Sequence, residues 1–203
     1  MALVEYFEAE RLLKKYKIRS VESRYVKSAE EAEKFSAGGR IVLKAVSGKA
    51  LHKSKSGLVV AGISGGEIGK AYSALERRAA KYRPYRILAQ KMVHGGIEII
   101  IGGSEDVQFG KMILLGLGGI YVEAFKDFAL RVCPINMEEA LSMIRQLRSR
   151  KIIAPDRASE KMVAELILKA ARMYQGGRMK ELDLNPIIIH DGTYDAVDIR
   201  MIK

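Results

Sequence analysis

The most informative stretch of the sequence is its end, where RMKELDLNPIIIH (178–190) and TYDAVDIRMI (193–202) flank an Asp191-Gly192 pair. Two apolar, β-branched runs around such a pair predict two antiparallel strands joined by a tight turn. Side chains alternate along a strand, so Asp183 and Asn185 should point to the same face. The turn would place Asp198 roughly opposite Asn185, close enough for the two side chains to share a ligand.

These three side chains offer two carboxylates and one amide oxygen. An all-oxygen set of this kind suits Mg²⁺ bound beside phosphate groups. A second interpretation is that Asp183 and Asp198 only occupy the solvent face of a hairpin, since acids on exposed strands are common. The residues alone leave both interpretations open.

The rest of the sequence mixes helical and strand patterns in no repeating order. Ser28, followed by Glu31 three residues later, is typical of a capping box and predicts a helix over 28–35. Strands over 85–93 and 96–104, on either side of Gly95-Gly96, should form an antiparallel hairpin. Further helices are expected over 3–16, 64–82, 136–149 and 157–174, and further strands over 40–46, 58–63, 110–118 and 128–135. The mixture predicts an α+β fold rather than a series of βα repeats.

The composition is that of an ordinary folded domain, with 203 residues of which 48% are hydrophobic and 29% charged. No apolar run approaches the roughly 18–20 residues that span a membrane. Acids near the N-terminus argue against a signal peptide, so we expect a cytoplasmic protein. The single cysteine, Cys133, excludes an internal disulfide, and its apolar neighbours predict a buried structural thiol.

The formal net charge of +11 points to an anionic partner. Nucleic acid, anionic substrates such as nucleotides or CoA, and an acidic partner subunit all fit. The basic residues are spread along the chain, without the aromatic-plus-basic stretch typical of nucleic-acid recognition. Charge alone does not choose among these partners.

Polar residues interrupt three of the apolar strands. Lys44 in IVLKAV (41–46) is either an exposed edge residue or a fixed positive charge for phosphate. Glu98 is an acid within the apolar GIEIIIG (96–102), and Arg131 could add a second positive charge. The glycine-rich GLGGIYVE (116–123) could let backbone amides approach phosphates.

A histidine, His52, lies in the polar loop ALHKSKSGL (50–58). A neutral imidazole can act as a covalent nucleophile. Lys53 and Lys55 would offset the charge of a phosphorylated imidazole. The alternative is a solvated loop histidine with no role, which is common.

Four segments, taken together and in this order, resemble one family. They are VLKAVSGKALHKS (42–54), AQKMVHGGIEIIIG (89–102), DVQFGKMILLGLGGIYVEAFKDFALRVCPI (106–135) and ELDLNPIII…AVDIR (181–200). They are similar to the ATP-grasp β subunits of NDP-forming acyl-CoA synthetases, above all the ADP-forming acetyl-CoA synthetases, and more distantly to succinyl-CoA synthetase β. The resemblance covers about residues 5–202. It implies an ATP-grasp fold whose two α+β lobes, 1–90 and 91–203, hold the nucleotide between them.

The resemblance also implies a set of nucleotide-binding residues. Lys44 matches the phosphate-binding lysine of the family, and Glu98 matches the acid that holds the ribose. The segment Gln90, Lys91, Met92 and Val93 matches the hinge whose backbone meets adenine.

Further residues match the parts of the family that surround the phosphates. Asn185 and Asp198 match the Mg²⁺ ligands, with Asp183 beside them. Glu123 and Arg131 lie in the segment that matches the wall near the phosphates. The resemblance thus adds weight to the metal interpretation of the closing hairpin.

For His52, the resemblance implies a phosphoryl carrier, because it matches the histidine of the HKS/HKT loop of the family. That loop usually continues with an acid and a glycine pair, whereas Lys55 follows here. Lys91 likewise replaces the acid of the usual QEM hinge, where its contact with adenine would be mainly through the backbone. His94 and His190 lie at predicted turns and have no expected catalytic role.

The function implied is that of a nucleotide-binding β subunit, which would need a CoA-binding α subunit in an α₂β₂ assembly. The reaction would be the reversible conversion of acyl-CoA, ADP and phosphate to acid, CoA and ATP. Two alternatives remain: an ATP-grasp ligase that makes an acylphosphate without His52, and a nucleotide-sensing or nucleic-acid-binding module without catalysis.

Overall fold

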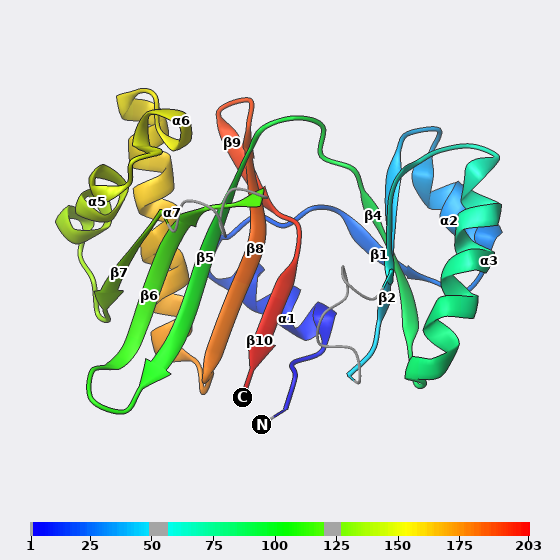
Figure 1. The fold of residues 1–203 in the computed structure, drawn as a ribbon, viewed down its shortest axis with the longest axis horizontal. Coiled ribbons are helices and arrows are strands. Elements are labelled where there is room, and N and C mark those ends of the chain that lie inside the picture. Colours follow the sequence, from blue (N-terminus) through cyan, green and yellow to red (C-terminus); the bar gives the residue numbers. More distant parts are fainter. Residues whose placement is uncertain (1, 49–56, 120–126) are drawn as a thin grey trace. The chain divides into compact units, whose positions relative to one another are not determined.

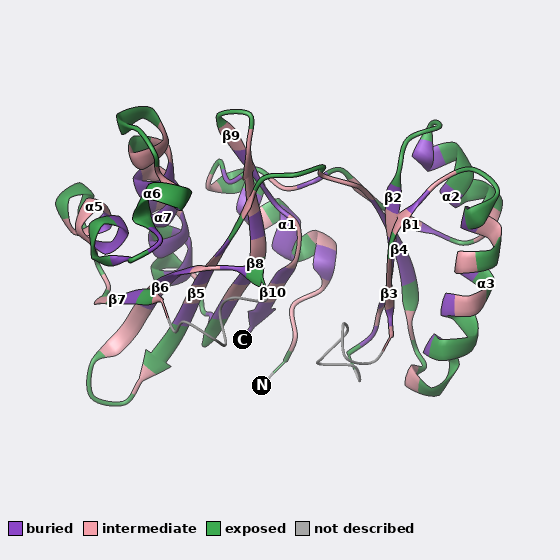
Figure 2. Cartoon of the chain, turned by 45° about the horizontal axis from the view of Figure 1, so that its top comes forward, coloured by how far each residue is buried: buried purple, intermediate pink, exposed green. Residues whose placement is uncertain are grey.

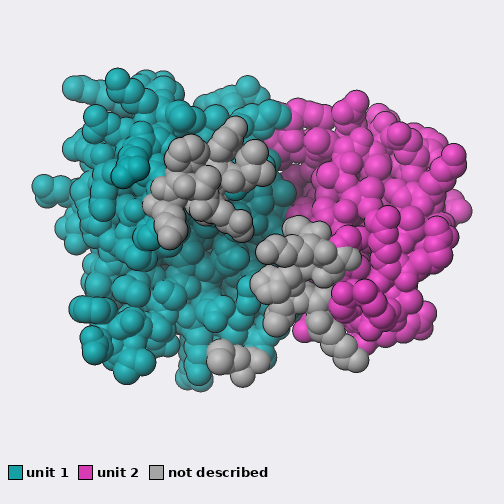
Figure 3. All heavy atoms as spheres, viewed as in Figure 1, with its two compact units in different colours: residues 1–20, 95–203 teal, residues 21–94 magenta. Residues whose placement is uncertain are grey.

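The computed structural model describes residues 2–48, 57–119 and 127–203, which form two compact units (Figure 1). Unit 1 comprises residues 1–20 and 95–203, and unit 2 comprises residues 21–94 (Figure 3). This division differs from the expected lobes 1–90 and 91–203. The N-terminal segment belongs to unit 1 because its backbone pairs with the last strand: the Ala2 amide donates to the Lys203 carbonyl at 2.8 Å.

Unit 2 is a four-stranded antiparallel sheet covered on one face by two helices. The strand order is β1 (Ser23–Val26), β4 (Arg86–Lys91), β2 (Ile41–Val46) and β3 (Val59–Ile63). The helices are α2 (Ala29–Ser36) and α3 (Glu67–Ala79), which continues into the 3₁₀ turn η1 (Ala80–Tyr82). Alternate residues of β2 enter the core because side chains of a strand alternate between its two faces. The core includes Ile41, Leu43, Ala45, Ile68, Leu75 and Ala89.

The start of helix α2 follows the predicted capping signal with one change. Ser28 caps the helix, since its hydroxyl oxygen accepts a hydrogen bond from the Glu31 amide at 3.3 Å. The Glu31 carboxylate does not return to Ser28; it accepts instead from the amide of Lys27, at 2.8 Å. Two backbone donors at the helix start are therefore satisfied.

Unit 1 is built on a six-stranded antiparallel sheet. Five strands follow the order β10 (Ile199–Ile202), β8 (Glu181–His190), β5 (Ile97–Asp106), β6 (Gly110–Leu117) and β7 (Phe128–Val132), and β9 (Thr193–Ala196) also pairs with β8. Helices α5 (Met137–Gln146) and α7 (Arg157–Gly176) pack on one face, with the short α6 (Arg150–Ile153) between them in sequence. Helix α1 (Tyr6–Lys15) contacts β10. Figure 2 shows the buried side of α7 facing the sheet.

The expected hairpin of 85–93 with 96–104 is wrong. Strand β4 pairs with β1 and β2 in unit 2, whereas β5 pairs with β6 and β8 in unit 1. Gly95 and Gly96 therefore connect two separate sheets rather than close a turn. The expected helix over 136–149 is confirmed as α5, and the short α6 that follows it was not expected.

Two remaining expectations concern Cys133 and the membrane. Cys133 is only partly buried, and that burial raises the pKa of its thiol above the usual value. Within the residues that the structure describes, no helix is long and apolar enough to cross a bilayer.

Candidate functional site

The closing hairpin places its three oxygen donors as the sequence predicted. Strand β8 pairs with β10 so that Leu184 lies opposite Ile199. The next pair along brings Asn185 opposite Asp198, and the Asn185 amide donates to the Asp198 carbonyl at 3.2 Å. Asp183 is partly buried and Asn185 is exposed, while Leu184 between them is fully buried. The polar side chains thus alternate with the apolar core.

Charges of both signs lie close together on this hairpin. Burial raises the pKa of Asp183, the neighbouring positive charge of Arg200 opposes that rise, and the negative charge of Asp198 adds to it. Arg200 lies directly opposite Asp183 in the strand register. Sequence reasoning missed Arg200, although its position two residues after Asp198 on one strand predicts the same face.

The donor set fits a magnesium ion. Hard divalent cations take carboxylate and amide oxygens, and Asp183, Asn185 and Asp198 supply these from two adjacent strands. One oxygen of Asp198 already accepts a hydrogen bond from the Ile199 amide at 3.1 Å, which fixes the carboxylate. Among the described residues, no group of three or more histidine, cysteine or acidic side chains could hold a metal. The candidate set thus has only two acidic members, and its third donor is the amide oxygen of Asn185.

Glu98 lies on β5 at a cavity of about 410 Å³ within unit 1. The Gly118 amide donates to the Glu98 carbonyl at 2.7 Å. A side chain at Gly118 would come within 2.8 Å of the Glu98 backbone, so only glycine fits here. The exposed Glu98 carboxylate lies beside Gly119, whose Cβ would be 3.2 Å from Oε2. The cavity is lined by Gly96, Ile97, Glu98, Leu117, Gly118, Gly119 and Ile152.

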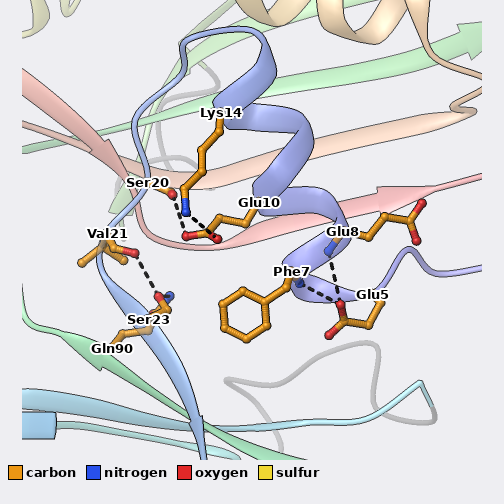
Figure 4. Close-up of polar contacts among 9 residues, drawn as sticks. All are labelled: Glu5, Phe7, Glu8, Glu10, Lys14, Ser20, Val21, Ser23 and Gln90. Atoms are coloured by element: carbon orange, nitrogen blue, oxygen red, sulfur yellow. Dashed lines mark hydrogen bonds and ion pairs between the residues drawn. The ribbon is translucent and has the colours of Figure 1, made fainter.

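In unit 2, Lys44 occupies the middle of strand β2 and is only 5% exposed. It lies opposite Leu88 on β4, so Gln90, two residues further, shares its face. Gln90 is fully buried, and its side-chain amide donates to the Ser23 hydroxyl at 3.0 Å. Ser23 in turn donates to the Val21 carbonyl at 2.9 Å (Figure 4). The side-chain amide group of Gln90 is thus bound to strand β1.

Lys91 has a role that the sequence did not reveal. Its ammonium group donates to the carbonyls of Phe35 and Ser36, at 2.6 and 3.0 Å, and lies 4.9 Å from the centre of the Phe35 ring. These carbonyls end helix α2, where backbone acceptors lack partners within the helix. The Lys91 backbone amide donates to the Glu22 carbonyl at 3.0 Å, and the Met92 amide donates to the Arg40 carbonyl at 3.1 Å.

The structure does not bring Arg131 together with the metal residues. Arg131 lies opposite Ile113, a fully buried residue, and its guanidinium donates to Ser142 and Gln146 of helix α5 at 3.0 and 3.1 Å. Asp183 lies one position along the strands from the residues that are paired in register with Arg131, so its side chain points to the opposite face of the sheet. Arg131 thus joins the sheet to α5.

Other candidate residues stand as follows. His52 and Glu123 lie outside the described residues. Val93 is partly buried, and His94 is exposed at the end of unit 2. His190 ends strand β8, where its Nε2 lies 2.9 Å from the Asp195 carboxylate.

Comparison with known proteins assigns the family. An ATP-grasp domain model matches residues 2–202. The chain is 36% identical over 207 residues to "Acetate--CoA ligase [ADP-forming] I subunit beta" of Pyrococcus furiosus, covering 96% of this chain and 89% of the relative. The chain belongs to the ATP-grasp family of ADP-forming acetate–CoA ligase β subunits. A single-chain Archaeoglobus fulgidus relative, "Acetate--CoA ligase [ADP-forming] I", is 37% identical over 176 residues, but the match covers only 26% of its length.

Solved structures agree with this assignment of the β-subunit chain. A dinucleotide-forming acetyl-coenzyme A synthetase of Ca. Korarchaeum cryptofilum, in complex with coenzyme A and Ca-AMPCP, matches with a TM-score of 0.89 and 32% identity, covering 99% of this chain and 93% of that one. A second structure of that protein matches with a TM-score of 0.81 and 32% identity, covering 99% and 92%. It holds coenzyme A and Mg-AMPPCP, with a phosphohistidine segment pointing towards its nucleotide site.

Proposed function

We propose that this chain is the nucleotide-binding β subunit of an ADP-forming acyl-CoA synthetase. The reaction is the reversible conversion of acyl-CoA, ADP and phosphate to acid, CoA and ATP. The observation that carries the proposal is the register of the closing hairpin, which sets Asp183, Asn185 and Asp198 together at the end of a chain that matches a β subunit over nearly its whole length.

Each group has a defined task in this proposal. Asp183, Asn185 and Asp198 hold Mg²⁺, which when bound neutralises charge on the phosphate oxygens. Lys44 adds a positive charge for the phosphates from a strand position that holds its backbone in place. Glu98 accepts hydrogen bonds from the ribose hydroxyls, because its carboxylate is exposed at the edge of the cavity. The backbone of Gln90, Met92 and Val93 contacts the adenine.

Phosphoryl transfer through His52 is the part of the proposal that rests on the sequence resemblance. A neutral imidazole nitrogen of His52 would attack the phosphorus of a phosphohistidine on the α subunit and break its P–N bond; a β-phosphate oxygen of ADP would then attack that phosphorus and release the His52 imidazole. Replacement of His52 by alanine would abolish turnover while leaving ADP binding intact. Turnover that survived this change would favour an ATP-grasp ligase that makes an acylphosphate without the histidine.

A CoA-binding partner chain completes the proposed enzyme. In the single-chain relative, about three quarters of the length lies outside the match to this chain. We expect the partner to supply this part, to set the acyl specificity and to form an α₂β₂ assembly, which native mass spectrometry of the co-expressed chains can test. The proposal retains the cytoplasmic location expected from the sequence.

Calorimetric titration of the chain with ADP, with and without Mg²⁺, tests the proposal. Asp198→Ala should weaken Mg²⁺-dependent ADP binding at least about tenfold, because it removes one charged ligand of a site with three protein donors. Asp191→Asn is the matched control, since this acid lies on the same hairpin with a side chain that is 96% exposed at the turn, and asparagine tolerates its φ of +46°.

The outcomes separate the proposal from its alternatives. Equal loss in both variants would show a general charge effect and overturn the metal assignment. No ADP binding by the chain, either alone or with its partner present, would overturn the catalytic proposal. Salt-sensitive nucleic-acid binding in its place would favour the non-catalytic module.

A further inference from the structure

Two segments join the units: the first connection, around residues 20–21, and the second connection, around residues 94–95. Both adjoin the hairpin of β8 and β9. The chain passes from unit 1 to unit 2 after Ser20 and returns before Gly95. At the first passage, the Ala196 amide on β9 donates to the Arg19 carbonyl at 3.0 Å, and Ser20 forms a parallel bridge with Ala196. The first connection is thus fixed to strand β9.

The second connection is fixed to the other strand of this hairpin, β8. Gly96 has a φ of +98°, and a Cβ on it would lie 2.5 Å from the Ile189 carbonyl and 3.3 Å from the His190 Cβ. Such a contact excludes any side chain other than hydrogen at this position. The chain therefore re-enters unit 1 pressed against the end of β8.

Three side chains tie the two strands to the first connection. The Asp195 carboxylate lies 2.9 Å from His190 Nε2 and accepts two longer contacts, both at 3.4 Å, from the guanidinium of Arg19. Asp195 is only 8% exposed, so its charge is shielded from water and these partners compensate for it. One carboxylate thus joins β9, β8 and the first connection.

Helix α1 fixes the same connection from its other side. The Ser20 hydroxyl donates to Glu10 at 3.3 Å, and Glu10 is paired with Lys14 at 2.9 Å (Figure 4). Glu10 is 7% exposed. Ser20, the last residue of unit 1 before the passage, is therefore tied both to α1 and to β9.

We propose that Asp195 and His190 are positioning residues: their contacts hold β8 and β9 together and fix the first connection to this hairpin, while the second connection, which follows the hinge segment 90–93, packs on the end of β8 beside His190. The inference rests on the proposed function, because β8 also carries Asp183 and Asn185. One hairpin then holds the metal ligands and the fixed end of the hinge. Neither Asp195 nor His190 contacts the nucleotide in this arrangement; both act through the connections.

Hydrogen exchange and ADP titration on the full chain test the anchor. Asp195→Ala should speed amide exchange in residues 18–20 and 95–97 by about fivefold or more, since local opening needs fewer contacts to break. It should also weaken Mg²⁺-dependent ADP binding several-fold. Asp191→Asn is the control, because Asp191 also lies near His190, at 3.5 Å, but is exposed, and asparagine tolerates its φ of +46°.

A second variant guards against general misfolding. Arg19→Gln removes the link between Arg19 and Asp195 at a side chain that is 58% exposed, so the core is not disturbed. It should reproduce faster exchange in residues 18–20 while the rest of unit 1 exchanges as in the wild type. Unchanged exchange at both connections in Asp195→Ala and Arg19→Gln would overturn the anchor. If the wild-type chain bound no ADP, the proposed function would fail, yet the exchange data would still decide the anchor.

Discussion

Replacement of Lys91 by methionine tests the reason for a lysine at the hinge. Methionine keeps an unbranched, apolar side chain but loses the ammonium group. The change removes two hydrogen bonds, of 2.6 and 3.0 Å, from a charged donor to the last carbonyls of helix α2, and a contact with the Phe35 ring. The direct consequence is a helix end without its cap.

The expected loss is about 2 kcal/mol in the free energy of unfolding of unit 2. Hydrogen bonds to charged groups contribute about 1.5–3 kcal/mol net, but water can replace part of this at a partly exposed helix end. The favourable interaction of a cation with a helix C-terminus adds about 0.3–1 kcal/mol, and the ring contact about 0.5–1 kcal/mol. These contributions overlap at one ammonium group, so their sum is an upper bound.

Urea denaturation followed by circular dichroism measures this loss. With a slope of about 1–3 kcal/mol per molar urea, the midpoint should fall by about 0.7–2 M at an unchanged slope. Lys34→Met is the matched control: Lys34 lies in the last turn of the same helix but is exposed, so it should change stability by less than about 0.5 kcal/mol. Lys91→Glu should cost more than Lys91→Met, because a carboxylate would face the carbonyls.

Equal effects of Lys91→Met and Lys34→Met would refute the capping argument. The affinity for ADP provides a second criterion. Because the Lys91 side chain points to α2, Lys91→Met should leave ADP affinity within about twofold while the chain remains folded. A larger change would show that the side chain contacts the nucleotide after all.

Two further changes test the scaffold around the site. Asp127→Asn should lower the free energy of unfolding by about 1 kcal/mol at pH 7, measured by thermal melting against pH. Burial raises the pKa of Asp127, but hydrogen bonds from Ser149 and Arg148 outweigh burial and lower the pKa. The stabilisation by the ionised carboxylate is therefore present above the unfolded-state pKa and is lost as pH falls through the folded-state pKa. Equal costs at pH 3 and pH 7 would contradict that sign. Gly118→Ala should lower the free energy of unfolding by about 1–3 kcal/mol and weaken ADP binding, because the new methyl group would meet the Glu98 backbone at 2.8 Å. The control is Gly69→Ala in α3, where a Cβ would have nothing within 4 Å; it should stabilise the protein slightly.

Local patterns in the sequence were sufficient for the closing hairpin. The alternation of apolar and polar residues and the Asp191-Gly192 turn fixed the register, and the structure has Leu184 opposite Ile199 and Ile187 opposite Ala196, as that turn requires. The metal candidates came together because they lie on neighbouring strands of one hairpin. Local signals of this kind need no knowledge of the rest of the fold.

Partners distant in sequence could not be predicted in the same way. Strands β4 and β5 flank a glycine pair typical of a turn, yet each finds its partner in a different sheet. A hairpin and a pair of strands in separate sheets have the same local sequence pattern, and only the burial available to each strand distinguishes them. Arg131 and Lys91 show the same limit, because their partners on α5 and α2 lie 11 to 56 residues away. A charged residue in a strand has the same local sequence pattern whether its side chain contacts a ligand or a helix.

The division into units also changes the meaning of the net charge. Unit 2, residues 21–94, contains fifteen lysines and arginines against six acids, a net charge of +9, whereas unit 1 contains twenty against eighteen. The excess of +11 is therefore concentrated in the smaller unit, which also carries Lys44 and the His52 loop. A positive field confined to one unit attracts anions to that unit. This field does not by itself distinguish a nucleotide from an acidic partner subunit. A partner subunit would be attracted over a broad surface, whereas a nucleotide needs fixed donors such as the buried Lys44. In the proposed function Lys44 would be that fixed donor, and the net positive charge of unit 2 would raise the local concentration of the anion.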